Sequence, residues 1–161
     1  MSVASGYASK RQNNVVSNVE ARATGDDSFA LFAAQDQNSG NLTGNTYQNL
    51  TALFPWRAAG VAIYGGFDNT IQNFVVADTL CYSGLTISSL NFGFAFEGFG
   101  ASPPTTIQNF SLARDGGHFW GSQVFGAIWV FSATNVFGWS PRRSRMNSSN
   151  SVSLSCCAPC S

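Results

Sequence analysis

A polar segment followed by an apolar run recurs four times along the chain. Each polar segment begins with asparagine or threonine and has asparagine at its fifth place, and the four segments are residues 14–19, 45–50, 69–74 and 105–110. The apolar runs that follow them are residues 29–33, 61–65, 85–89 and 127–131. This pattern is an internal repeat, and it predicts two short strands in every unit.

Successive repeats begin 31, 24 and 36 residues apart, so their spacing varies while the repeated residue types stay the same. Such variation is typical of stacked coils that carry insertions in their loops. We therefore predict an all-β fold in which about four coils stack as a parallel β-helix, each pairing its backbone with the next at about 4.8 Å. An antiparallel sandwich with repeated turns remains the alternative, because short strands at regular spacing also predict that fold.

Asparagines at two fixed places of the repeat also favour stacked coils. An asparagine amide tolerates a left-handed backbone and forms local hydrogen bonds at turns. Stacking would place equivalent amides above one another, so we expect ladders of asparagine along the stack. The members of the two expected ladders are Asn14, Asn45 and Asn69, and Asn18, Asn49, Asn73 and Asn109.

The composition agrees with a single β domain and excludes several classes of partner. Of the 161 residues, 44% are hydrophobic, 14% are aromatic and only 10% are charged, which is not typical of long helices. Eight Lys and Arg balance eight Asp and Glu, so the chain has no positive field to attract nucleic acid or anionic lipid. No apolar run approaches the about 20 residues of a membrane span. We expect a neutral partner, and neither nucleic acid nor a membrane.

Three segments differ in composition. Residues 1–12 are predicted to be irregular, residues 13–139 to hold the repeats, and residues 140–161 to form a disordered tail rich in serine and cysteine. All aromatic residues lie at or before Trp139. The first segment has no apolar stretch of the kind found in signal peptides. Because the repeats start abruptly and give way to an unrelated tail, we expect a fragment of a longer protein, monomeric if it folds.

The cysteines do not indicate a metal site. Cys156, Cys157 and Cys160 are close together, but no second cysteine pair or nearby histidine accompanies them to complete a tetrahedral zinc site. Cys81 stands alone and is predicted to be a small buried residue. We expect no cofactor and no metal.

Two adjacent aspartates, Asp26 and Asp27, are the first candidates for chemistry. Like charges side by side raise one another's pKa and disfavour folding, so the pair needs a compensating reason. One reason is acid–base work on a glycosidic bond; the other is a turn, in which Gly-Asp-Asp-Ser is ordinary. Adjacent strand residues face opposite ways, so both carboxyls can address one groove only if the chain bends there.

Five segments, taken in order, match one known family. They are Thr-Gly-Asp-Asp at 24–27, Phe-Ala-Leu-Phe at 29–32, and the stretches 56–66, 78–89 and 114–120. Over residues 13–139 the chain resembles the catalytic β-helix of the α-1,3-glucanase and mycodextranase family of glycoside hydrolases. The resemblance implies a right-handed parallel β-helix of the pectin-lyase type. It also implies extracellular hydrolysis of α-glucan with inversion, by several aspartates along one face of the helix.

The resemblance maps two catalytic aspartates onto Asp26 and Asp27. It implies another aspartate on a preceding coil, which this chain does not contain, and one on the following coil, where Ala58 and Ala59 stand instead. We therefore expect the catalytic set of the chain to be incomplete.

Later repeats place further polar and aromatic residues on the same edge. The candidates for substrate binding are Trp56, Arg57, Asp78, Tyr82, Asp115, His118 and Trp120. Aromatic faces offer apolar surface to the C–H groups of sugars, and Arg or His can hydrogen-bond hydroxyl groups. Each candidate also has a structural interpretation, because large residues routinely cover cores and Arg57 can pair with Asp27.

Three functions compete. The first is a fragment of a secreted polysaccharide hydrolase acting on α-1,3-linked glucan, whose truncation leaves its own activity open. The second is a non-catalytic carbohydrate-binding or adhesin-like β-helix, in which Asp26 and Asp27 only shape a turn. The third is a lyase-type β-helix with calcium-binding acids and an anionic uronate substrate, against which the scarcity of Lys and Arg argues.

Overall fold

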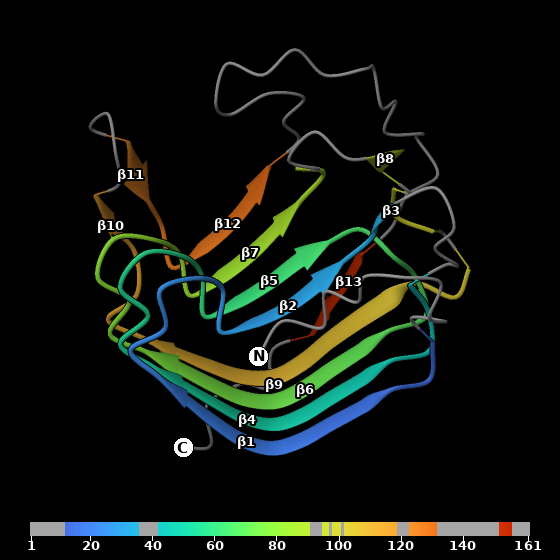
Figure 1. The fold of residues 1–161 in the computed structure, drawn as a ribbon, viewed down its shortest axis with the longest axis horizontal. Helices are drawn as coiled ribbons and strands as arrows, with labels where there is room; N and C mark the ends of the chain where they lie inside the picture. The colour runs from blue at the N-terminus through green and yellow to red at the C-terminus, as the bar shows by residue number, and fades with distance from the viewer. Residues whose placement is uncertain are drawn as a thin grey trace.

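The structure is a computed structural model and describes residues 12–35, 42–90, 95–96, 98–100, 102–118, 123–131 and 152–155. All regular secondary structure in these ranges is β-strand, arranged in two larger sheets and two small pairs (Figure 1). The described ranges therefore contain no helix that could span a membrane.

The larger sheet has five strands, and every neighbouring pair in it is parallel. In spatial order its strands are β1 (Val15–Arg22), β4 (Thr46–Leu53), β6 (Thr70–Ala77), β9 (Thr105–Ala113) and β13 (Val152–Ser155). The register places Val15 beside Thr46, Thr46 beside Thr70 and Thr70 beside Thr106, so the four repeats align residue by residue. The first four strands are the predicted polar segments.

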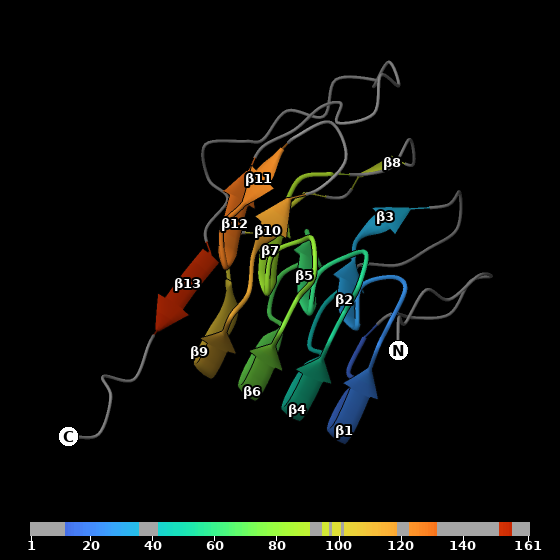
Figure 2. The same cartoon turned by 90° about the vertical axis from the view of Figure 1, so that its left-hand side faces the viewer.

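The second large sheet has four strands, again all parallel. In spatial order they are β12 (Ile128–Phe131), β7 (Leu85–Ser88), β5 (Val61–Tyr64) and β2 (Phe29–Phe32). These are the predicted apolar runs. The chain thus alternates between the sheets and stacks one coil on the next, as Figure 2 shows from the side. The prediction of parallel stacking is confirmed, the antiparallel sandwich is wrong for both large sheets, and the arrangement is consistent with a β-helix.

Two antiparallel pairs lie outside these sheets. One joins β3 (Ala34–Gln35) to β8 (Ala95–Phe96), and the other joins β10 (Gly117–His118) to β11 (Val124–Phe125). Both are built from segments between the main strands, which is where the variable repeat spacing predicted insertions.

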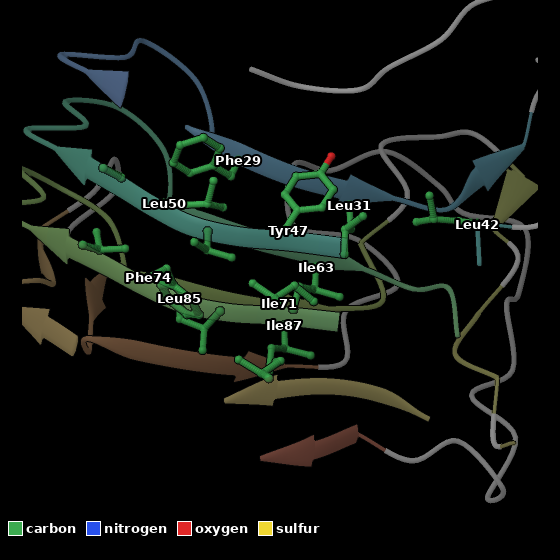
Figure 3. Packing of buried hydrophobic residues seen from close by; sticks show 14 of the residues in the cluster. Phe29, Leu31, Leu42, Tyr47, Leu50, Ile63, Ile71, Phe74, Leu85 and Ile87 are labelled. Atoms are coloured by element: carbon green, nitrogen blue, oxygen red, sulfur yellow. The ribbon is translucent and has the colours of Figure 1, made fainter. Parts of the chain in front are cut away.

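The hydrophobic core lies between the two large sheets. Figure 3 shows side chains of both sheets meeting there. Fully buried members of this cluster include Phe29, Leu31, Tyr47, Leu50, Ile63, Ile71, Phe74, Leu85 and Ile87. Equivalent residues stack between coils, as the rings of Phe74 and Phe110 do with 5.0 Å between their centroids. Burying each of these side chains contributes roughly 1.5 to 3 kcal/mol, so the core accounts for much of the cohesion between the sheets.

The exposed asparagine ladder marks a bend in each long strand of the first sheet. Asn18, Asn49, Asn73 and Asn109 all have left-handed backbones, with φ between 53° and 56°. Their side-chain amides are joined from coil to coil by hydrogen bonds of 3.1 to 3.4 Å. The bend explains why buried residues of β4 fall at Tyr47, Leu50 and Ala52 instead of strictly alternating.

The second asparagine ladder lies at the start of the same strands, where Asn45 and Asn69 are buried and Asn14 is exposed. Asn14 donates from Nδ2 to Oδ1 of Asn45, and Asn45 donates in the same way to Asn69, both at 2.8 Å. Asn69 in turn donates to the hydroxyl of Thr105 at 3.4 Å, where the fourth repeat has threonine instead. Both predicted ladders are confirmed.

The tail departs from its prediction at one place. Val152–Ser155 form β13 and pair with β9 in parallel, although residues 140–161 were predicted to be a disordered tail. Valine and leucine alternate with serine in this segment, a pattern that suits a strand. Residues 1–11, 132–151 and 156–161 lie outside the described residues.

Candidate active site

The described site candidates, His118 on β10 apart, lie in the turns that leave the first sheet, on one side of the molecule (Figure 1, left). We call these four turns, residues 23–28, 54–60, 78–84 and 114–116, the turn edge. Each turn opens with a residue in the left-handed conformation, namely Ala23, Phe54, Asp78 and Arg114. Since these residues occupy equivalent places in successive coils, residues far apart in sequence are brought onto one edge.

Asp26 and Asp27 lie in the first turn of the turn edge. The chain bends there, which is the condition for both carboxyl groups to address one groove. Asp26 is exposed, and its Oδ1 accepts a hydrogen bond of 2.9 Å from the backbone N–H of Asp27. Asp27 is partly buried, and both of its carboxyl oxygens accept hydrogen bonds from the next coil. Ala59 donates its backbone N–H to Oδ1 at 2.9 Å, and Tyr64 donates its hydroxyl to Oδ2 at 3.1 Å.

The environment of Asp27 perturbs its titration. Burial is the main cause that raises the pKa of Asp27 from 3.8 to about 6, and the charge of Asp26 adds to it. The hydrogen bonds from Ala59 and Tyr64 act in the opposite direction. A carboxyl group with a pKa near 6 can hold or release a proton close to neutral pH, which is what acid–base catalysis requires.

Two tyrosines of later coils interact with the charge of Asp27. Burial and the charge of Asp27 raise the pKa of Tyr64 well above its ordinary value, and the same two causes raise the pKa of Tyr82. Both phenols are therefore neutral hydrogen-bonding groups at ordinary pH. Tyr82 was predicted from the sequence, whereas Tyr64 was missed because it stands in an apolar run and has the pattern of a core residue.

Trp56 lies beside the aspartate pair. Its indole packs on Gly25, where an added Cβ would be only 2.7 Å from Cζ2 of the indole, and half of its surface is exposed. Its backbone N–H donates to the carbonyl oxygen of Thr24 at 3.0 Å, which ties the second turn to the first. The thiol of Cys81 donates to the carbonyl oxygen of Trp56 at 2.9 Å, so this cysteine is partly buried and hydrogen-bonded instead of being a core residue.

Asp78 and Arg57 differ in their ion pairing. Arg114 donates to both carboxyl oxygens of Asp78, at 2.5 and 2.8 Å, and this contact is the main cause that lowers the pKa of Asp78. The ion pairs found within the described ranges are this one and Arg22–Glu20. The structural interpretation that paired Arg57 with Asp27 is therefore not supported, and Arg57 lies exposed on the second turn.

Asp115 contacts the turn of the preceding coil, residues 78–84. Its Oδ1 accepts the backbone N–H of Thr79 at 3.2 Å, while its Oδ2 is buried over Gly84 without a hydrogen-bond partner among the described residues. A Cβ on Gly84 would come within 2.5 Å of that oxygen, so the close contact depends on glycine. Burial is the main cause that raises the pKa of Asp115.

The later coils contribute aromatic side chains to the outer face of the second sheet. Tyr82 contacts Phe125 and Trp129, with ring centroids 4.4 and 5.7 Å apart, and Trp129 stacks on Phe131 at 3.6 Å. Sequence reasoning missed Trp129 and Phe131, which alternate with inward residues on β12. His118 is exposed on β10, and Trp120 lies outside the described residues.

No group of three or more His, Cys, Asp or Glu side chains comes together as a possible metal site in the part of the chain that the structure describes. Cys156, Cys157 and Cys160 lie outside it.

One family profile matches most of the chain. Its description is alpha-1,3-glucanase catalytic domain D2, and the match covers residues 4–140. No curated protein matches the chain at a significant level.

Solved structures of GH87 α-1,3-glucanase catalytic domains, each a variant with one aspartate replaced by alanine, are similar to this chain. One in complex with tetrasaccharides is 47% identical, with a TM-score of 0.73 over 76% of this chain and 24% of that chain. A second complex with tetrasaccharides is 46% identical, with a TM-score of 0.70 over 76% and 23%. A third, with nigerose, is 46% identical, with a TM-score of 0.67 over 75% and 23%. The chain thus spans about a quarter of the length of the structures it matches.

Proposed function

We propose that this chain, which belongs to the family of α-1,3-glucanase catalytic domains, carries part of the active site of a glycoside hydrolase acting on α-1,3-linked glucan. The observation that carries the proposal is the pair Asp26 and Asp27 in the first turn of the turn edge. One carboxyl is exposed, and the other is held by the next coil with a pKa of about 6.

The relatives support a catalytic role for this pair. The aspartates replaced in the two tetrasaccharide complexes are consecutive residues of that protein. Asp26 and Asp27 are the one pair of adjacent aspartates in this chain. An enzyme that loses a reactive carboxyl can retain its oligosaccharide, so such variants suit the trapping of substrate.

We further propose a right-handed parallel β-helix and hydrolysis with inversion. Inversion needs a general acid at the leaving oxygen and a general base that activates water, with carboxyl groups roughly 6.5 to 9.5 Å apart. Coils stacked at about 4.8 Å offer such separations along one edge. A further aspartate is replaced in the nigerose complex, which supports a set of carboxyl groups larger than one pair.

Exposed side chains of the turn edge and of β10 suit a sugar chain. Trp56 is half exposed and its indole packs on Gly25, next to the pair in sequence, and aromatic faces bind the C–H groups of sugars. Arg57 and His118 are exposed and can donate hydrogen bonds to hydroxyl groups. Because a polymeric glucan does not enter cells, we propose that the protein acts outside the cell. We also propose that it acts as a monomer.

Release of reducing sugar from α-1,3-glucan tests the proposal. We expect Asp26→Asn and Asp27→Asn each to lower the rate at least about 100-fold, because each removes a group that transfers a proton. Asp68→Asn is the matched control, since Asp68 is exposed on the opposite turn, has a left-handed backbone that asparagine tolerates, and should leave the rate unchanged. A rate unaffected by either substitution at the pair would reject the proposal.

The second candidate is a non-catalytic carbohydrate-binding protein. The exposed Trp56 and the aromatic residues around Tyr82 favour it, because they provide a binding surface without reactive groups. Isothermal titration with α-1,3-linked oligosaccharides distinguishes the two candidates. Binding without sugar release, unchanged in both Asp26→Asn and Asp27→Asn, would favour this second function.

A further inference from the structure

Both carboxyl oxygens of Asp27 are held from outside their own turn. The backbone N–H of Ala59, just before β5, donates to Oδ1, and the hydroxyl of Tyr64, at the end of β5, donates to Oδ2. Both donors therefore belong to the next coil, one in its turn and one at the end of β5. The orientation of this carboxyl depends on how coils stack, and the turn that contains it does not set it alone.

The ring of Tyr64 is fixed by packing. Only 3% of its surface is exposed, and its ring meets that of Phe32 edge to face, with centroids 5.6 Å apart. Tyr64 also belongs to a buried cluster on the outer side of the second sheet with Ala30, Ala62 and Leu90. A phenol ring buried in this way keeps its hydroxyl in one place, so the hydrogen bond to Asp27 is preorganised.

We propose that Tyr64 is the positioning residue of Asp27: its hydroxyl fixes the orientation of the carboxyl group and stabilises the ionised form. The effect on hydrolysis rests on the proposed function, whereas the effect on Asp27 itself does not.

The groups around Asp27 predict the direction of the effect. Asp26, on its own turn, disfavours the ionised carboxyl, as burial does, while the donors from Ala59 and Tyr64 favour it. Tyr82, from the third coil, is a neutral phenol, and the charge of Asp27 contributes to its raised pKa. Removing the hydroxyl of Tyr64 leaves Oδ2 in a poorly hydrated site without that donor, so the pKa of Asp27 should rise further.

Carbon-13 NMR of the labelled Asp27 carboxyl, titrated in the 161-residue chain, tests the proposal without using activity. In Tyr64→Phe we expect the midpoint to move upward from about 6 by roughly one pH unit. Tyr47→Phe is the matched control, because Tyr47 is equally buried but donates its hydroxyl to the backbone carbonyl of Ala30. An unchanged midpoint in Tyr64→Phe, or an equal shift in Tyr47→Phe, would overturn the proposal.

A second measurement keeps the phenol in place, in case Tyr64→Phe does not fold. In a chain labelled with 3-fluorotyrosine, the fluorine signal of Tyr64 should titrate with the midpoint of Asp27, and Asp27→Asn should abolish that step. A fluorine signal of Tyr64 that does not change as Asp27 ionises would contradict the proposal.

Activity then separates the two proposals. For α-1,3-glucan we expect Tyr64→Phe to lower kcat about tenfold with little change in KM, and to move the acid limb of the pH profile upward. Sugar release that is unaffected by Asp26→Asn and Asp27→Asn, together with the shifted NMR midpoint, would reject the hydrolase and keep the role of Tyr64. Normal hydrolysis with an unshifted midpoint would do the reverse.

Discussion

At the scale of single residues, the site combines positions that the sequence identifies with one that it hides. Asp26 and Asp27 stand out because acids are scarce and because the pair directly precedes an apolar run. Trp56 stands out as a large aromatic residue shortly before the next apolar run. Tyr64 does not stand out, since Val-Ala-Ile-Tyr has the pattern of a buried strand. Only the pairing of Phe32 with Tyr64 between adjacent coils brings its hydroxyl to Asp27. Catalytic and binding roles at these positions stay predictions until they are measured.

The raised pKa of Asp27 makes stability depend on pH. Its folded value of about 6 lies above the ordinary 3.8, so between these values the folded state keeps a proton that the unfolded state has released. The contribution of this proton is fully present below pH 3.8 and is lost as pH rises through 6.

Asp27→Asn should therefore make the chain more stable at pH 7, by on the order of 2 kcal/mol, because it removes the cost of a buried charge. The gain should largely disappear near pH 4. Melting temperatures of wild type, Asp27→Asn and the exposed control Asp68→Asn, measured at both pH values, check this. A variant less stable than wild type at pH 7 would contradict the prediction.

Gly25→Ala should disturb Trp56 more than it disturbs the fold. The new Cβ would lie 2.7 Å from Cζ2 of the indole, which has to shift, at a cost of roughly 1 to 3 kcal/mol. Tryptophan fluorescence and the Kd for α-1,3-linked oligosaccharides report the change, and we expect weaker binding. Gly126→Ala is the control, because its Cβ would meet its nearest atom at an ordinary 3.4 Å. Equal effects of both substitutions would count against a binding role for Trp56.

At the scale of elements, the repeat predicts the main strands and misses the small ones. Eight strands of the two large sheets coincide with the polar segments and apolar runs, because each run is long enough to show its pattern. The two-residue strands β3, β8, β10 and β11 have no pattern of their own and depend on contacts formed after folding. β13 was missed because its surroundings are rich in serine.

The two asparagine ladders should differ in their contribution to stability. Asn69 is buried and donates to the carbonyl oxygen of Leu42 at 3.1 Å, while it accepts from the backbone and the side chain of Asn45. Asn69→Ala leaves those groups unpaired and should cost about 2 to 4 kcal/mol. Asn73→Gly, which keeps the left-handed backbone of an exposed ladder, should cost about 1 kcal/mol or less.

Urea unfolding of these two variants measures the difference. Circular dichroism at equilibrium gives the free energy of unfolding of each, and a similar m-value in both would show that the same unfolded state is compared. Equal losses would mean that the buried amides do not hold the coils in register.

At the scale of the whole molecule, stacking leaves an edge at β1. Among the described strands, β1 pairs with β4 alone, and it carries the exposed ion pair between Glu20 and Arg22. Charged residues on an edge strand oppose pairing with another chain. Parallel stacking was predictable from the repeats, and exposed edges at the ends of the stack follow from it.

Glu20→Val should promote self-association. Thr51→Val is the matched control, because Thr51 lies beside Glu20 in the register but on the interior strand β4. Size-exclusion chromatography over a range of concentrations should show larger species for Glu20→Val only, since a new valine on an interior strand creates no open edge. Identical elution of both variants would contradict the prediction.

The in-register ladders also determine how the molecule would respond to a pulling force. Force applied along the stacking axis acts on the hydrogen bonds of one coil boundary at a time, so coils should peel away in succession at low force. Force applied along the strands acts on every bond of a boundary at once and has to shear them together. The protein should therefore be mechanically anisotropic, weak along its axis and resistant across it.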